Sequence, residues 1–191
     1  MASVMGDGDG ISPSAGSSGG DSSPPGSSAA EESAGASITR DGEPQGRNLR
    51  VDFYVIEEAS GTARLRVACR LAEKAYLASQ RALIWHTDRA ELEALDALLW
   101  TFADGSFVPH EWLTSNAAGE APVLLSAGSP PTESFDFVVN LAADPPPFLH
   151  LTRRIAEIID GDDGRRRAGR ARFKTYRELG VEPATHPLRA E

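Results

Sequence analysis

From residue 50 onward, short apolar runs alternate with amphipathic stretches. Residues 50–56 are rich in β-branched and aromatic side chains, which predicts a first strand. Apolar positions recur at spacings of three and four over residues 62–79, which predicts a helix with one buried stripe. Residues 82–86 form an apolar run typical of a buried parallel strand, and Asp88 begins a second helix that ends near Trp100. This order of elements predicts a parallel sheet with crossover helices.

The second half of the chain continues the pattern less regularly. Residues 101–121 are mostly a connection, and short apolar runs predict strands over residues 122–126 and 135–141. Isoleucines at helical spacing predict a helix over residues 149–159, and a last helix is expected over residues 165–179. Together the two halves predict an α/β fold with a mostly parallel sheet flanked by helices.

The first 47 residues have a different composition. Gly, Ser and Pro supply 25 of residues 1–47, and none of these residues is aromatic. Such a segment has too little apolar surface to offset the entropy lost on ordering, so we expect a disordered leader. This leader could be a functional tether, but a leader without a role of its own or a misassigned start codon is favoured. Residues 48–191 are expected to form a single α/β domain.

Charge is unevenly distributed along the chain. The net charge of −9 argues against a surface that grips nucleic acid as a whole. The stretch from Gly164 to Arg177, however, holds seven basic residues and no acidic one. No apolar run is long enough to span a membrane, and there is no signal-peptide pattern. With Cys69 as the one cysteine, we expect a cytoplasmic protein.

Sequence motifs of common enzymes are absent. There is no phosphate-binding loop of the G-x-x-x-x-G-K-[ST] type, no dinucleotide fingerprint and no G-x-S-x-G elbow. The histidines and the cysteine lack zinc-ligand spacing, so neither a metal nor another cofactor is expected. Cys69 lies on the apolar stripe of its helix and is interpreted as a core residue. His110 and Glu111 could pair as acid and base, but no third partner is evident, and structural roles are favoured.

Two groups of residues are candidates for protein contacts. The first joins Trp100, at the end of a helix, to Phe107 on a proline-containing loop. Aromatic side chains are the ones most able to anchor an interface, although both rings could equally close one end of the core.

The second group lies on the last helix. Positions 170, 173, 174 and 177 share one helical face, which combines three cations with one aromatic ring. Arginine pairs well with carboxylates, so this face suits an acidic ligand that also brings an apolar side chain. The alternative is that Phe173 packs inward while the cations are solvated.

Taken together, these stretches resemble the chi subunit family of bacterial DNA polymerase III holoenzyme. The motifs that carry the resemblance are Leu98-Leu99-Trp100, followed by Ser106-Phe107-Val108-Pro109-His110, and the closing Arg172-Phe173-Lys174-Thr175-Tyr176-Arg177. The match runs in order from about residue 50 to residue 181 and excludes the leader. It implies a Rossmann-like fold in three layers without a nucleotide-binding motif or a bound cofactor.

The resemblance also implies a function. Members of the family are non-catalytic clamp-loader accessory subunits that link the psi subunit and the clamp loader to the C-terminal tail of single-stranded-DNA-binding protein. That tail is an acidic run ending in Pro-Phe, and DNA is reached only through it. The residues implied for the tail site are Arg170, Phe173, Lys174 and Arg177. The residues implied for the psi surface, for which an XPD/DinG-like helicase competes, are Trp100, Phe107, Val108 and Pro109.

Two other hypotheses remain. The same arginines could bind single-stranded nucleic acid directly, which predicts a steep dependence on salt. The chain could also be a small α/β enzyme with a site around Cys69, His86 or His110, which predicts a pocket that joins these residues at the C-terminal ends of the strands. The lack of an aromatic stacking platform counts against the first, and the missing motifs count against the second.

Overall fold

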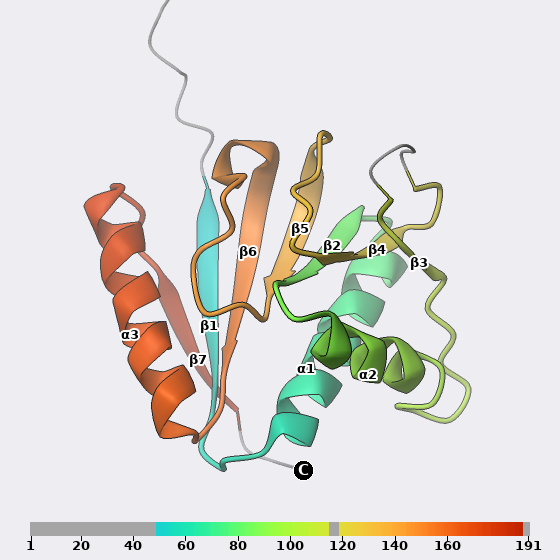
Figure 1. Cartoon of the computed structure of the whole chain (residues 1–191), viewed down its shortest axis with the longest axis horizontal. Helices are drawn as coiled ribbons and strands as arrows, with labels where there is room; N and C mark the ends of the chain where they lie inside the picture. Colours follow the sequence, from blue (N-terminus) through green and yellow to red (C-terminus); the bar gives the residue numbers. More distant parts are fainter. Residues whose placement is uncertain (1–48, 115–118, 189–191) are drawn as a thin grey trace, which may run out of the picture. The chain divides into compact units, whose positions relative to one another are not determined.

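The computed structural model describes residues 49–114 and 119–188 of the chain (Figure 1). Strands and α-helices alternate at the start and the end of this part, and strands follow one another in between. In chain order the elements are β1 (Arg50–Ile56), α1 (Gly61–Leu77), β2 (Ala82–His86), α2 (Arg89–Leu99), β3 (His110–Trp112), β4 (Val123–Ala127), β5 (Phe135–Asn140), the 3-10 turn η1 (Leu149–Leu151), β6 (Thr152–Ile159), α3 (Asp163–Glu178) and β7 (Ala184–Leu188). The predicted leader at residues 1–47 lies outside the described residues.

The seven strands form one sheet in which every neighbouring pair is parallel. Their order across the sheet is β3-β4-β2-β5-β6-β1-β7. β2 lies between β4 and β5, with Ile84 opposite Leu125 on one side and Val139 on the other. The predicted Rossmann-like α/β fold is therefore confirmed, with a sheet that is parallel throughout the described residues.

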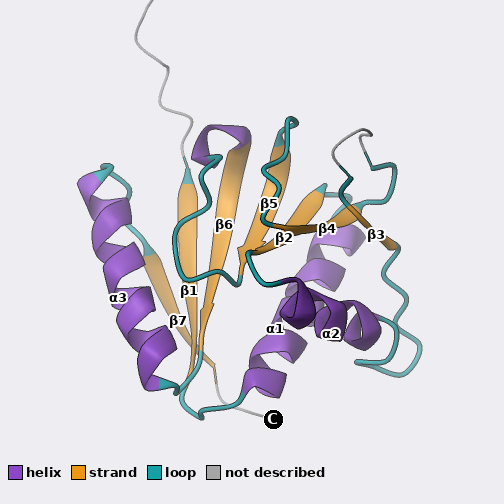
Figure 2. Ribbon diagram, viewed as in Figure 1, coloured by secondary structure: helices purple, strands orange, loops and turns teal. Residues whose placement is uncertain are grey.

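Helices cover both faces of the sheet (Figure 2). α1 and α2 pack on one face, where Ala68 and Leu92 join a cluster of buried side chains. α3 packs on the other face, where Tyr176 contacts a second cluster that includes Phe53 and Ile155. Alternate residues of each strand point to opposite faces, so one buried strand supplies both clusters. None of the helices in the described part of the chain is long and apolar enough to cross a membrane.

Each α-helix of the described residues begins with a side-chain cap. The hydroxyl of Ser60 accepts from the Ala63 N–H at 3.1 Å, and the carboxylate of Asp88 accepts from the Ala90 N–H at 2.8 Å. At the start of α3, the Asp162 carboxylate accepts from the Arg165 N–H at 2.8 Å. These bonds satisfy N–H groups that lack a partner within the helix, which explains why the helices begin at these residues.

The helix predicted over residues 149–159 is wrong. Only Leu149–Leu151 form a 3-10 turn, and Thr152–Ile159 form β6, which lies between β5 and β1. Its residues from 155 onward are all buried, because helices cover both faces of this strand. Isoleucines at spacings of three and four therefore reflect burial on both faces of a strand, not the stripe of a helix.

Two edge strands were not predicted. β3 is three residues long and lies inside the expected connection at residues 101–121. β7 pairs with β1 at the opposite edge of the sheet, with Thr185 opposite Phe53. Its sequence contains Pro187, which a strand tolerates only where it is at an edge. The other predicted strands and helices are confirmed to within two residues.

Candidate functional site

A buried network of polar side chains holds α3 against the sheet. The carboxylate of Glu157 on β6 is fully buried and accepts three hydrogen bonds. The donors are Arg172 Nε at 2.7 Å, the Tyr176 hydroxyl at 2.7 Å and Asn140 Nδ2 at 2.9 Å. Two of these donors belong to α3 and the third to β5, so the network fixes both the position and the rotation of the helix.

The charge of this network is balanced by one arginine. Burial raises the pKa of Glu157 above its ordinary value, and the Arg172 guanidinium opposes that shift. Burial beside the same carboxylate raises the pKa of Tyr176, so the hydroxyl remains a donor. Arg172 is itself buried and also donates to the carbonyl of Ala143 at 2.7 Å. It is therefore a structural residue, unlike the exposed Arg170 and Lys174 of the same helix.

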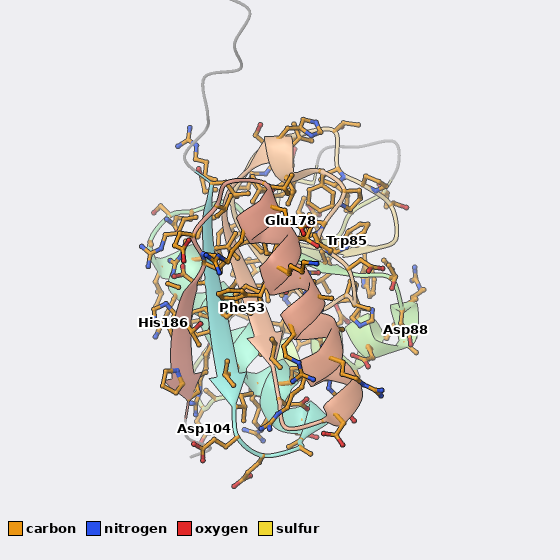
Figure 3. The ribbon with its side chains drawn as sticks, turned by 90° about the vertical axis from the view of Figure 1, so that its left-hand side faces the viewer. Phe53, Trp85, Asp88, Asp104, Glu178 and His186 are labelled. Carbon is orange, nitrogen blue, oxygen red and sulfur yellow. The ribbon has the colours of Figure 1, made fainter. Side chains whose placement is uncertain are left out.

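A groove with a cavity volume of about 350 Å³ lies between α3 and the strands β6, β1 and β7. Its apolar lining comes from three elements, namely Phe53 and Val55 of β1, Ile159 of β6 and Phe173 of α3. The rings of Phe53 and Phe173 lie 5.2 Å apart. Figure 3 looks onto α3 and shows Phe53 between the helix and β1. Phe173 is thus half-buried, packed against the sheet on one side and open to the groove on the other.

Cations surround this apolar lining. Arg166 and Arg170 line the groove itself, and a second hollow begins on the other side of Phe173, lined also by Lys174 and Arg177. Within the described part of the chain, Arg170 has no ion-pair partner, and Arg166 donates only to backbone carbonyls. The structure therefore brings together all four residues predicted for the tail site.

Two of these cations have weak partners on the protein. Lys174 lies 3.6 Å from Glu178, and Arg177 lies 3.8 Å from Glu182. All four side chains are more than half exposed, so each pair contributes little and can exchange for a ligand carboxylate.

Trp100 and Phe107 form an exposed aromatic pair on the α1/α2 side of the sheet. Their side chains are 54% and 59% exposed, and their rings lie 5.4 Å apart. The His110 ring lies 4.9 Å from Trp100, and its Nε2 is 3.2 Å from a carboxylate oxygen of Asp96. Such exposure is uncommon for two adjacent large aromatic rings and is typical of a contact surface.

The remaining residues predicted for that surface lie deeper. Val108 is 1% exposed and belongs to the core, and Pro109 is half-buried. The Ser106 hydroxyl donates to Glu73 at 2.6 Å, which anchors the loop to α1. Val108 therefore fixes the loop from inside while Phe107 points outward.

The residues considered for an enzyme are occupied by structural contacts. Burial raises the pKa of the Cys69 thiol to about 12, so it stays protonated and unreactive. His86 Nδ1 accepts from the Asp88 N–H at 2.6 Å, and its Nε2 faces Glu91 at 3.3 Å. Among residues 49–114 and 119–188, no group of His, Cys, Asp or Glu is arranged to hold a metal ion.

Sequence reasoning missed two parts of this site. Arg166 was treated only as part of a basic run, although it lies four residues before Arg170 and hence on the same helical face. Gly169 was not singled out, yet a side chain there would overlap Ile159 at the base of the groove. The i, i+4 spacing could have identified Arg166, whereas Gly169 required the packing against β6.

The fold and the two surfaces define a Rossmann-like α/β protein with candidate sites for protein contacts. The sequence model of the family described as DNA polymerase III chi subunit, HolC, matches residues 49–184. The DNA polymerase III subunit chi of Pseudomonas aeruginosa is 41% identical over 139 residues, which cover 73% of this chain and 96% of that protein. Proteins of the same name from Haemophilus influenzae and Escherichia coli are 28% and 26% identical and are covered to 93% and 90% of their lengths. The chain belongs to the DNA polymerase III chi subunit family and is a replication accessory subunit.

The fold also resembles that of a protein outside this family. A crystal structure of T4 UvsW matches 75% of this chain with a TM-score of 0.56 and 9% sequence identity, and the match spans 42% of that chain. At this identity the similarity concerns the fold alone.

Proposed function

We propose that this protein is a non-catalytic, cytoplasmic adaptor that joins the DNA polymerase III assembly to single-stranded-DNA-binding protein. In this proposal the groove beside α3 holds the C-terminal tail of the binding protein, so that DNA is reached indirectly. The Trp100–Phe107 surface contacts the psi subunit, and through it the clamp loader, and an XPD/DinG-like helicase competes for it.

The observation that carries the proposal is the composition of the groove. Apolar side chains line it, and Arg166 and Arg170 border it without an acidic partner among the described residues. A C-terminal Phe brings an apolar ring and a carboxylate on one residue, which matches this combination. Acidic residues that precede the Phe can pair with Lys174 and Arg177 in the adjoining hollow.

The ring and the charges should contribute differently. Burial of a Phe side chain is worth about 1.5–3 kcal/mol, which corresponds to more than a tenfold change in affinity. Each exposed ion pair contributes about 0.2–1 kcal/mol, or roughly 1.4- to fivefold, and weakens with salt. A single tail should bind modestly, and several tails on one nucleoprotein filament would raise the effective concentration.

The second surface is supported by the exposed aromatic pair. Trp100 follows the last residue of α2 and Phe107 lies on the next loop, whereas the groove lies beside α3 on the opposite face of the sheet. One molecule can therefore contact two partners at once, which an adaptor requires. The variant Trp100→Ala, Phe107→Ala should lose binding to psi in a pull-down and keep binding to the tail.

The direct test is a titration with a fluorescent peptide that matches the last ten or so residues of the organism's own single-stranded-DNA-binding protein. We expect saturable binding that falls more than tenfold when the final Phe is removed. The variant Arg170→Ala, Lys174→Ala should also weaken binding, while Arg153→Ala, an exposed arginine outside the groove, should not. If the intact peptide does not bind and bare single-stranded DNA binds instead, the proposal is wrong and direct nucleic-acid binding replaces it.

A further inference from the structure

A second cavity, of about 210 Å³, lies at the C-terminal edge of the sheet. It is bordered by the ends of β2, β5 and β6 and by the first turns of all three α-helices of the described chain. Figure 1 shows β1 and β6 running to this lower edge, where α1 and α3 begin. The polar side chains in its lining are Arg64, His86, Thr87, Glu91, Arg165 and Arg172.

The position of this cavity favours an anion. Open parallel sheets bind ligands outside the carboxyl ends of their strands, in the crevice between helices of the two faces. The N-terminal turn of a helix carries a partial positive charge and N–H groups that lack helical partners. Here α1 and α2 come from one face and α3 from the other, so three such turns meet around one small space.

Arg64, in the lining of this cavity, has one N–H donor without a hydrogen-bond acceptor among the described residues. The side chain is 4% exposed; Nη1 donates to the Leu141 carbonyl at 3.0 Å, and Nη2 contacts Glu91. Its Nε is buried without a hydrogen-bond partner among the described residues. Burial lowers the pKa of Arg64, and Arg165 and Arg172 lower it further, while the carboxylates of Glu91 and Asp160 oppose the shift. The guanidinium groups of Arg165 and Arg172 are thus close enough to repel that of Arg64.

Arg165 and Arg172 also have N–H donors that are not used in these contacts. Arg165 uses Nε and Nη2 to bind Asp160, and Arg172 uses Nε and Nη1 to bind Glu157 and a backbone carbonyl. Both acids lie outside the lining of the cavity. Glu91 is the one carboxylate in the lining, where it contacts both Arg64 and the neutral His86 ring.

We propose that this cavity binds a phosphate group, either as free phosphate or as the end of a small phosphorylated molecule. Three guanidinium groups, one from α1 and two from α3, match a tetrahedral group with several acceptor oxygens better than a planar carboxylate. The volume is below the roughly 300–1,000 Å³ of pockets for drug-sized ligands, so it suits the phosphate alone. The bound anion displaces Glu91 from Arg64, and the Thr87 hydroxyl adds a further donor.

The test is calorimetric titration of the full-length protein with inorganic phosphate, at constant ionic strength kept with sodium chloride. Glycerol 3-phosphate and ATP are titrated in parallel, to separate free phosphate from a phosphorylated ligand. Arg165→Gln should weaken binding by about tenfold or more, since a hydrogen bond to a charged group is worth roughly 1.5–3 kcal/mol. Glu91→Gln should tighten binding several-fold, because it removes the competing carboxylate.

Matched controls separate this cavity from the groove on the other side of α3. Arg170→Gln should leave phosphate binding unchanged, and Arg165→Gln should leave binding of the tail peptide unchanged. Thermal unfolding checks that each variant is folded, and the tightening by Glu91→Gln cannot result from misfolding. The proposal is overturned if none of the three probes gives saturable binding, if Glu91→Gln does not tighten it, or if Arg170→Gln weakens it as much as Arg165→Gln.

Discussion

The substitution Arg172→Met tests whether the Glu157 network fixes α3 on the sheet. It leaves a buried carboxylate without its counter-charge, and breaking a buried ion pair from one side costs about 3–5 kcal/mol. Tyr176 and Asn140 still donate to Glu157, and the methionine retains most of the packing volume, so we expect the lower end, about 3 kcal/mol. This is a large part of the roughly 5–15 kcal/mol that stabilises a domain.

The assay is urea unfolding of the wild type and the variant at several pH values. Without Arg172, the pKa of Glu157 rises further above its ordinary value of 4.5, since burial already raises it. Between the raised pKa of Glu157 in the folded wild type and its higher pKa in the folded variant, only the variant takes up a proton on folding, so the variant gains stability relative to the wild type as the pH falls. The deficit should therefore shrink on acidification, by up to about 1.4 kcal/mol per pH unit.

Two further variants complete this test. Arg170→Met changes an exposed arginine on the same helix and should cost less than about 0.5 kcal/mol. The double variant Glu157→Leu, Arg172→Met removes both charges and should recover much of the loss. A deficit below 1 kcal/mol for Arg172→Met, or one that does not change with pH, would refute the role assigned to the network.

Three other outcomes follow from the structure. Cys69 should not react with a thiol reagent at pH 8 until urea unfolds the protein, because burial raises its pKa to about 12; rapid labelling of the folded protein would contradict this. Burial would raise the pKa of Asp52, but hydrogen bonds to the carboxylate outweigh burial and hold the pKa below 3.8. Asp52→Asn should therefore destabilise the protein at pH 7, and this loss of stability should shrink as the pH falls below about 4. In Gly169→Ala the methyl group would overlap the Ile159 side chain at a cost of about 1–3 kcal/mol, and the helix propensity of Ala offsets about 1 kcal/mol of it. We expect a net loss of up to about 2 kcal/mol in urea unfolding, and a gain in stability would show that the contact relaxes freely.

Helices and strands are predicted best from the sequence where their apolar pattern fits only one type of secondary structure. The apolar run Ala82–His86 and the amphipathic Gly61–Leu77 were both identified correctly. Thr152–Ile159 was assigned to a helix because a strand buried on both faces has no alternation, and its isoleucines happen to fall at helical spacing. Ala184–Leu188 was missed because an edge strand with a proline gains its order from pairing with β1, far away in the sequence.

The candidate site, like the fold, was predicted from the sequence in part. Helical spacing placed Arg170, Phe173 and Lys174 on one face without any structure. It did not separate Arg172 from its neighbours, because its partner Glu157 lies in the segment whose secondary structure was wrongly assigned. The apolar half of the groove comes from β1 and β6, and a distant strand cannot be placed beneath a helix by local periodicity.

The central claim is that the groove beside α3 holds the end of an acidic tail. The most direct measurement is isotope-filtered NMR of the labelled protein with the unlabelled tail peptide, which detects contacts between the terminal Phe ring and protein side chains. We predict contacts from that ring to Val55, Ile159 and Phe173, together with shifts of the Arg166 and Arg170 side-chain signals. Contacts to Trp100 and Phe107 instead, or no contacts to the groove at saturation, would contradict the account.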